Sequence, residues 1–190
     1  MLVYLHGFNS SAQSSKARLL GEYLQQRGLS HRYASPSLPR RPAQAIATAE
    51  AAMAGNPGSE VCFVGSSLGG FYATHLAEKH NAGAVLINPA INPHIGLRAY
   101  LGPQRNLYTG ETYQLTEADL QQWEELCVPR IAPQRYLLLI ETGDEVLDYR
   151  QAVNFYAGAR QVVVEGGDHS LQSFPQHLPA ILEFAGIRAA

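Results

Sequence analysis

This 190-residue chain contains little cysteine, which excludes some kinds of fold and metal site. It has only two cysteines, Cys62 and Cys127, which lie far apart and match neither a disulfide framework nor a zinc-binding spacing. A reducing compartment is the simplest explanation for this pattern, and we therefore expect a cytoplasmic protein.

Dense blocks of one charge are also missing. Charged residues make up 16% of the chain, and 14 Lys and Arg residues nearly balance 16 Asp and Glu residues. No Lys- or Arg-rich block is present and the aromatic residues are not interleaved with basic ones, so we expect no nucleic-acid partner. No cluster of His, Asp and Glu has metal-ligand spacing, and no glycine-rich phosphate-binding fingerprint occurs. We accordingly expect neither a metal nor an organic cofactor.

Long apolar runs are absent as well. The chain opens on a short apolar run at residues 2–5, with no basic region followed by a long apolar segment, so we expect neither a signal peptide nor insertion into a membrane. A length of 190 residues and an apolar fraction of 46% are typical of one globular domain, which we expect to span residues 1–190. Nothing in the sequence specifies an oligomeric state.

The sequence does contain short apolar runs that alternate with helical patterns. The runs expected to form strands lie at residues 2–5, 31–34, 61–64, 84–87, 136–140 and 161–165. Helical spacing or propensity marks residues 14–26, 43–53, 68–79, 149–157 and 175–185. Asn56-Pro57-Gly58 is expected to form the turn before the strand at Val61. This alternation predicts an α/β fold in three layers, with about six mainly parallel strands and helices on both faces.

The alternation is interrupted over residues 90–133. This segment is rich in Gly and Pro, contains a single predicted helix from Thr116 to Leu126, and is too long for a simple connection. Its apolar and aromatic side chains, Tyr100 and Tyr108 among them, are suited to lining a pocket, although they could equally pack the segment onto the domain. We therefore expect an insertion that acts as a partial cap.

A Gly-x-Ser-x-Gly motif, Gly65-Ser66-Ser67-Leu68-Gly69, stands between an apolar run and a helical pattern. In that context the motif predicts a sharp strand-to-helix turn with Ser67 at its apex. Side chains at Gly65 and Gly69 would clash in so tight a turn. The following helix points its positive N-terminus at the apex, which favours negative charge developing there.

A serine nucleophile needs a base within hydrogen-bond reach, and the base needs an orienting carboxylate. His169 follows the last strand and Asp144 follows the strand before it, so both are expected at the carboxyl edge of the sheet beside the serine. The chain order of serine, acid and histidine is that of α/β-hydrolases. Asp148, near a helix start, and Asp168, directly before the base, are weaker candidates for the acid.

An oxyanion that forms at the serine needs two backbone N–H donors. One is expected from Leu68 and the other from Phe8, in the loop after the first strand, with Asn9 as the alternative donor. His6 and Asn9 are also candidates for the substrate pocket, together with the aromatic pair of the insertion, although the His6 side chain is more simply explained as fixing the loop. Glu141, at a strand end, is a candidate supporting group.

These motifs resemble those of small bacterial α/β-hydrolases, in the esterase family typified by YqiA. The similar stretches are Tyr4-Leu5-His6-Gly7-Phe8-Asn9-Ser10-Ser11, Gly65-Ser66-Ser67-Leu68-Gly69-Gly70-Phe71-Tyr72-Ala73, Tyr108-Thr109-Gly110-Glu111, Thr142-Gly143-Asp144-Glu145-Val146-Leu147-Asp148-Tyr149 and Gly167-Asp168-His169. The resemblance covers almost the full length. It implies a cytoplasmic serine esterase for small-molecule acyl esters or thioesters such as acyl-CoA, with Ser67, Asp144 and His169 as its triad.

Two alternatives share the same fold. One is a non-catalytic binding protein, which is an alternative because fold alone does not imply function. The presence of all three triad side chains disfavours it. The other is an acyltransferase that uses the same triad, since neither the acyl acceptor nor the leaving group produces a motif. The resemblance supplies no particular substrate and no acyl chain length.

Overall fold

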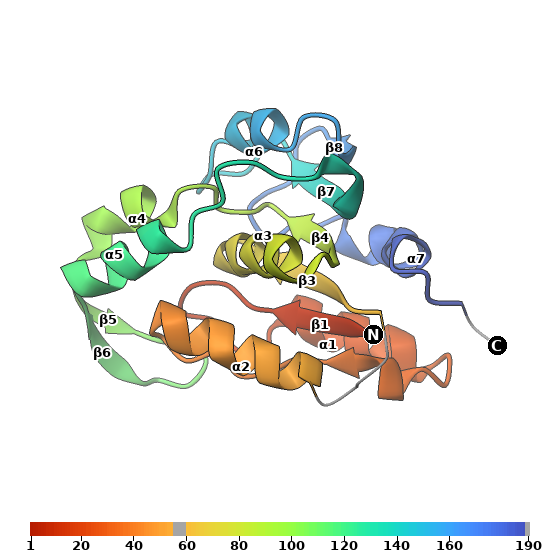
Figure 1. The fold of residues 1–190 in the computed structure, drawn as a ribbon, viewed down its shortest axis with the longest axis horizontal. Helices are drawn as coiled ribbons and strands as arrows, with labels where there is room; N and C mark the ends of the chain where they lie inside the picture. The colour runs from red at the N-terminus through yellow and green to blue at the C-terminus, as the bar shows by residue number, and fades with distance from the viewer. Residues whose placement is uncertain (55–59, 189–190) are drawn as a thin grey trace.

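A computed structural model describes residues 1–54 and 60–188 (Figure 1). The expected turn at Asn56-Pro57-Gly58 lies outside these residues. The main strands are β1 (Leu2–Leu5), β2 (Tyr33–Ala34), β3 (Cys62–Ser66), β4 (Gly83–Ile87), β7 (Tyr136–Glu141) and β8 (Arg160–Val164). They form one sheet in the order β2-β1-β3-β4-β7-β8, and every pair is parallel. The parallel six-stranded sheet predicted from the alternating pattern is confirmed.

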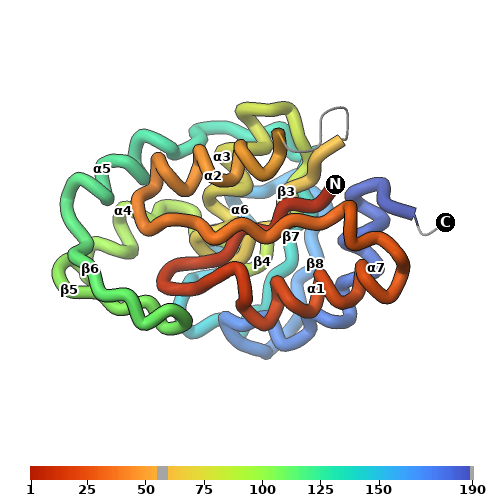
Figure 2. Tube along the Cα trace, turned by 90° about the horizontal axis from the view of Figure 1, so that it is seen from below, coloured from red at the N-terminus to blue at the C-terminus, as the bar shows by residue number. Residues whose placement is uncertain are grey.

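Helices cover both faces of this sheet because its central strands are apolar on both sides. All residues of β1, β3 and β7 are buried, as a parallel strand between two helical layers requires. The covering helices are α1 (Ser15–Gln25), α2 (Pro42–Ala54), α3 (Leu68–His80), α6 (Tyr149–Phe155) and α7 (Phe174–Phe184). α1 and α7 pack on one face, and α2, α3 and α6 pack on the other (Figure 2).

The second strand is shorter than expected. The sequence predicted a strand over residues 31–34, but Ser30–Arg32 form a 3-10 turn and only Tyr33 and Ala34 pair with β1. The helix before it ends where Gly28 has a φ of 71°, and the short connection from there to the sheet edge turns before it extends. The first half of the predicted strand was therefore wrong.

The segment after β4 has more structure than the sequence predicted. It contains α4 (Pro93–Gly96), a 3-10 turn (Leu97–Tyr100), an antiparallel hairpin of β5 (Gly102–Arg105) and β6 (Thr112–Leu115), and α5 (Glu117–Glu125). Only α5 was predicted, from its Thr116 cap, and the capping box there pairs Thr116 with Asp119. The hairpin was missed because its strands have only four residues each and β5 begins with Gly102 and Pro103, which are uncommon in strands.

All these elements of the segment lie at one end of the molecule, with the hairpin beside α5 (Figure 1). The carboxyl ends of the parallel strands point toward the same end, so the loops that follow β1, β3, β7 and β8 meet the segment there. This is the edge at which open α/β sheets bind ligands. None of the helices within residues 1–54 and 60–188 has the length and apolar character needed to span a membrane.

Candidate active site

A sharp turn places Ser67 alone between a strand and a helix. β3 ends at Ser66 and α3 begins at Leu68. Ser67 has a φ of 54° and a ψ of −120°, in a region that residues with a side chain rarely adopt. Such strain persists only where the surrounding structure holds it, and it is common at active sites. The turn has the shape that the Gly-x-Ser-x-Gly motif predicted.

The flanking glycines allow three elements to approach closely. A Cβ atom on Gly65 would overlap the backbone of Gly69, and a Cβ atom on Gly69 would overlap the carbonyl of Leu5. A Cβ atom on Gly70 would lie 2.6 Å from the Pro89 side chain. No larger residue fits at these positions without moving backbone, which is why the turn requires glycine on both sides of the serine.

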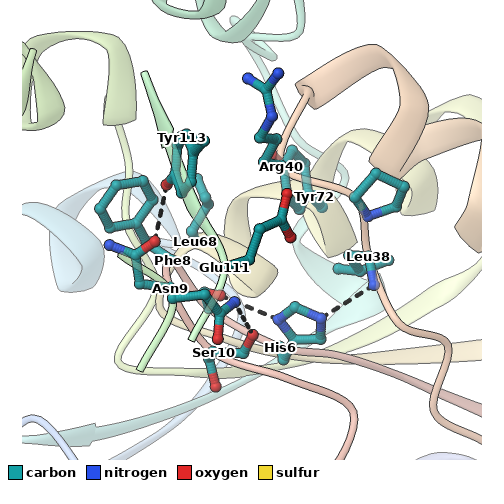
Figure 3. A pocket seen from close by; sticks show the side chains of 13 residues that line it. His6, Phe8, Asn9, Ser10, Leu38, Arg40, Leu68, Tyr72, Glu111 and Tyr113 are labelled. Atoms are coloured by element: carbon teal, nitrogen blue, oxygen red, sulfur yellow. Dashed lines mark hydrogen bonds between the residues drawn. The ribbon is translucent and has the colours of Figure 1, made fainter. Parts of the chain in front are cut away.

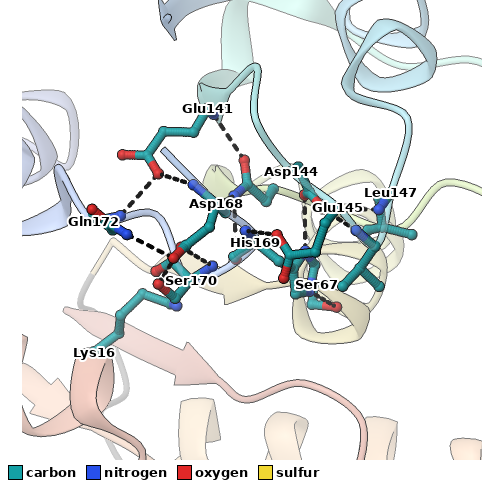
Figure 4. Close-up of polar contacts among 12 residues, drawn as sticks. Lys16, Ser67, Glu141, Asp144, Glu145, Leu147, Asp168, His169, Ser170 and Gln172 are labelled. Carbon is teal, nitrogen blue, oxygen red and sulfur yellow. Dashed lines mark hydrogen bonds and ion pairs between the residues drawn. The ribbon is translucent and has the colours of Figure 1, made fainter. Parts of the chain in front are cut away.

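The structure brings Ser67, His169 and Asp144 into one chain of hydrogen bonds (Figure 4). His169 Nε2 lies 3.0 Å from Ser67 Oγ, and His169 Nδ1 lies 2.8 Å from Asp144 Oδ2. A carboxylate can only accept, so Nδ1 has the proton and Nε2 is free to accept from the serine hydroxyl. The Asp144 side chain is 1% exposed and that of His169 is 21% exposed, so the base alone faces the solvent side.

Asp144 is held as an anion by its neighbours. Burial acts to raise the pKa of its carboxyl, but hydrogen bonds from His169 and from the amides of Leu147 and Val146 outweigh burial and lower the pKa below its ordinary value. Asp144 Oδ1 accepts from those amides at 2.8 and 2.9 Å, while Oδ2 accepts from the histidine. Both oxygens are thus used, which fixes the carboxylate toward the imidazole.

The first loop passes directly against the turn at Ser67. A Cβ atom on Gly7 would lie 3.2 Å from the Ser66 carbonyl oxygen and 3.3 Å from Ser67 Cβ. Phe8, the next residue, lines the same cavity as Ser67 and Leu68. No acceptor among the described residues takes a hydrogen bond from the Phe8 or Leu68 amide. Both N–H groups are therefore available to an oxygen atom of a bound molecule.

A protein family matches this chain over nearly its full length. The model of a family described as Uncharacterised protein family (UPF0227) matches residues 1–186. The chain belongs to this family. The match covers nearly the whole chain, and it confirms the resemblance to the YqiA-like group that the sequence motifs indicated.

Solved structures similar to this chain share its fold. Alpha/beta hydrolase domain-containing protein 10 from mouse superposes with a TM-score of 0.74 at 14% identity, over 96% of this chain and 87% of that one. One of the metagenome-derived lipolytic enzymes LipS and LipT gives 0.68 at 19%, over 97% and 92%. An alpha/beta superfamily hydrolase from Oenococcus oeni PSU-1 gives 0.65 at 16%, over 97% and 92%. At these identities the similarity shows the α/β-hydrolase fold.

The loop that contains His169 is fastened by a buried carboxylate. Glu141, the last residue of β7, is 1% exposed and accepts hydrogen bonds from the amides of Asp168, Gln172 and Ser173 at 2.9, 2.9 and 2.7 Å. Burial acts to raise the pKa of Glu141, but these bonds and one from the Ser173 hydroxyl together hold it below the ordinary value. A Cβ atom on Gly167, where φ is 69°, would overlap this carboxylate.

Asn88, directly after β4, fastens the same loop and was not predicted from the sequence. Its Nδ2 donates to the carbonyls of Asp168 and His169 at 3.1 and 3.2 Å, while its Oδ1 accepts from the Glu141 amide at 3.1 Å. The side chain is 2% exposed and every hydrogen-bonding group on it has a partner. Its position directly after β4, at the carboxyl edge of the sheet, was the available signal.

Glu141→Gln is expected to lower the free energy of unfolding at pH 7 by about 2 kcal/mol. The glutamine oxygen is a weaker acceptor than a carboxylate, and the glutamine NH₂ group would face backbone N–H groups that need an acceptor. The folded-state pKa of Glu141 is lowered, so its contribution to stability is present above the unfolded-state pKa of about 4.3 and is lost as the pH falls through the folded-state pKa. The difference between the two proteins should therefore shrink in acid.

Urea denaturation at pH 7 and at several values below pH 5 measures this difference. The exposed Glu22 of α1 provides the matched control, since Glu22→Gln removes the same charge without removing a hydrogen bond to a described residue. A Glu141→Gln deficit that stays constant from pH 7 into acid would contradict the role of the ionised carboxylate.

The four residues predicted to line the substrate pocket do not lie together in the structure. A cavity of about 640 Å³ opens at Ser67 and His169, and Tyr100 is part of its wall. His6 and Asn9 instead line a separate, smaller cavity of about 80 Å³ beside the first loop (Figure 3). Tyr108 lines neither of these two cavities and is 54% exposed.

His6 has a structural place in the first loop. Its Nε2 accepts from the Leu38 amide at 3.0 Å, so the proton is on Nδ1, which lies 3.1 Å from the Gly7 carbonyl oxygen. Burial lowers the pKa of His6, in keeping with a neutral ring. Among the described residues, no group of three His, Cys, Asp or Glu side chains is placed to hold a metal ion.

Proposed function

We propose that this protein is a serine hydrolase that cleaves acyl esters or acyl thioesters, with Ser67 as nucleophile, His169 as base and Asp144 as its orienting acid. The observation that supports this most directly is the unbroken line of hydrogen bonds from Ser67 Oγ through the imidazole to a buried carboxylate. The strained turn, which holds the serine at the apex between β3 and α3, supports it further.

In the acylation step, Ser67 Oγ attacks the carbonyl carbon of the substrate while His169 Nε2 takes the hydroxyl proton. The carbonyl oxygen becomes an oxyanion, and we assign the amides of Phe8 and Leu68 as its donors. The N-terminus of α3 lies at the same point and favours the negative charge. When the intermediate collapses, His169 gives its proton to the departing alcohol or thiol, and the acyl group stays on Ser67.

Deacylation repeats these steps with water. His169 takes a proton from the water molecule as its oxygen attacks the acyl carbon, and the same two amides hold the second oxyanion. Collapse returns the proton to Ser67 and releases the carboxylic acid. Throughout the cycle Asp144 keeps the ring in the tautomer with Nδ1 protonated and stabilises the imidazolium that forms.

The cavity at Ser67 favours an apolar acyl group. Its wall is mainly apolar, with Phe8, Leu68, Pro89, Ile91, Pro93, Ile95, Leu97, Tyr100, Val146 and Leu147 among its lining residues. Several of these come from α4 and the 3-10 turn after it, both within residues 90–133. We therefore propose that this segment acts as a partial cap, which closes one side of the acyl site of a small-molecule substrate.

A fluorophosphonate probe tests this proposal. We expect the probe to modify the wild-type protein at Ser67, as located by mass spectrometry, and we expect His169→Ala to react far more slowly because its serine lacks a base. A hydrolysis screen over esters and acyl thioesters of graded chain length then defines the acyl preference. No adduct on Ser67 in the folded wild-type protein would favour a non-catalytic binding protein.

A further inference from the structure

The β5–β6 hairpin is tied to the loop after β1 by four hydrogen bonds. Each of the four joins Asn9 or Ser10, directly after Phe8, to one of residues 104–113. The bonds are Leu107 N–H to the Asn9 carbonyl (3.1 Å), Tyr113 Oη–H to Asn9 Oδ1 (2.8 Å), Asn9 Nδ2 to Gln104 Oε1 (3.2 Å) and Asn106 Nδ2 to the Ser10 carbonyl (2.9 Å). Figure 3 shows the Tyr113 hydroxyl pointing at the Asn9 side chain.

These bonds hold Asn9 in an uncommon conformation. Its φ is 51°, in the left-handed region that residues other than glycine seldom adopt and that asparagine tolerates better than most. The hairpin engages the carbonyl, the side-chain oxygen and the side-chain nitrogen of Asn9 at once. A strained residue persists where its surroundings over-determine it, and here the hairpin provides those surroundings.

Phe8 is anchored on its other sides as well. The preceding residues are held because His6 accepts from the Leu38 amide and bonds the Gly7 carbonyl. The Phe8 ring packs edge-on against Tyr100 and Trp123, each with ring centroids 6.4 Å away. The residues on both sides of Phe8 are therefore held in place by hydrogen bonds, and those on its C-terminal side come from the hairpin.

We propose that Asn9 and Tyr113 are positioning residues for the oxyanion donor at Phe8, so that the hairpin belongs to the catalytic apparatus as well as to the cap. The inference rests on the proposed function of Ser67. Its physical basis is that an oxyanion donor must lie about 2.7–3.1 Å from the oxygen of the transition state, so small shifts of the loop are costly. Loosening Asn9 lets the Phe8 backbone depart from that position.

Tyr113→Phe is the sharpest test, because it removes the hydroxyl that bonds Asn9 and keeps the ring that lies 5.4 Å from the Arg40 guanidinium. Burial raises the pKa of Tyr113 to about 12, so the hydroxyl is a donor across the usual pH range. We expect kcat to fall about tenfold and KM to stay within about twofold of wild type. The fall in kcat is smaller than the loss of about 10²–10³ for a missing oxyanion donor, because the donor is displaced and not removed.

Tyr33→Phe is the matched control. The Tyr33 hydroxyl donates to the Ala17 carbonyl at 2.7 Å, between the sheet edge and α1, so this variant also loses one tyrosine hydrogen bond. We expect its kcat to equal that of wild type. An equal fall of kcat in both variants would mean that lost stability, and not the position of Phe8, explains the effect.

The Asn9 side supplies a conservative rescue. Asn9→Asp keeps an acceptor for the Tyr113 hydroxyl and tolerates the left-handed backbone, so we expect it to retain more activity than Asn9→Gly, which keeps only the backbone freedom. In a double-mutant cycle, Asn9→Gly and Tyr113→Phe should be strongly non-additive, because each breaks the same contact. Additive losses would overturn the pairing.

A trifluoromethyl ketone separates transition-state stabilisation from substrate binding. Ser67 Oγ adds to its carbonyl carbon, His169 takes the serine proton, and the carbonyl oxygen becomes an oxyanion held by the two amides. We expect Tyr113→Phe to weaken this inhibitor by the same factor as it lowers kcat/KM. Unchanged inhibition alongside unchanged kcat would overturn the inference.

The NMR resonance of the Phe8 amide provides a readout that does not depend on turnover. We expect it to shift in Tyr113→Phe and to stay in place in Tyr33→Phe, whereas an unmoved resonance in both would contradict the coupling. Failure of the proposed function has a different signature, namely wild-type protein whose Ser67 does not react with the fluorophosphonate probe.

Discussion

Ser67→Ala is expected to lower kcat by about 10⁵-fold or more, the scale of loss when a serine nucleophile is removed from a complete triad. The variant has no oxygen to attack the carbonyl, and His169 then has nothing to deprotonate except water. KM should change little, since the cavity wall stays in place. Steady-state hydrolysis of an activated ester measures both constants.

Folding provides the control for this variant. Alanine at position 67 must adopt the same φ of 54° that serine already adopts, and it removes only the hydroxyl. We therefore expect the midpoint of thermal unfolding to stay close to that of wild type. A Ser67→Ala variant that kept full activity on the activated ester would show that the reaction does not pass through this serine.

Asp144→Asn is expected to lower kcat by about 10⁴-fold while the site keeps its shape. The amide would present an N–H₂ group to His169 Nδ1, which selects the tautomer with the proton on Nε2. That tautomer cannot accept the proton of Ser67. The remaining amide oxygen can still accept from the Val146 and Leu147 amides, so the loop should stay folded.

Asp148→Asn separates the two acids that the sequence places close together. Asp148 caps α6 and pairs with Arg150 at the surface, and its substitution should lower kcat less than tenfold if only a surface cap weakens. Parallel pH–rate profiles for both variants complete the comparison. A larger loss of kcat in Asp148→Asn than in Asp144→Asn would show that Asp148, and not Asp144, is the orienting acid.

Short sequence motifs were sufficient to predict which side chains meet at the centre of the candidate site. Ser67 and Asp144 follow β3 and β7, which are fully buried, and His169 follows β8, which is only partly buried. Parallel strands place their carboxyl ends at one edge of the sheet. Any chain with this alternation brings such loops together, so the meeting of these side chains could be expected before their distances were known.

Contacts between distant segments were not predictable in the same way. Asn88 bonds a loop 80 residues further along the chain, and Asn9 bonds Tyr113 across 104 residues. Neither residue belongs to a pattern with a local period, and both depend on the turns that the backbone takes at φ values of 39° and 51°. Asn9 was predicted from the sequence as a pocket residue or an alternative oxyanion donor, and its side-chain bonds to Tyr113 and Gln104 were not foreseen.

The amino-acid order thus establishes the layered sheet, the turn at Ser67 and the family of the chain, because strand burial and glycine sterics act over a few residues. How the loops around that turn are held is a matter of three-dimensional packing. The Glu141 carboxylate and the Asn88 amide fasten the histidine loop, and the short β5–β6 hairpin fastens the loop of Phe8. Such hydrogen bonds form between groups that meet only after the sheet has assembled.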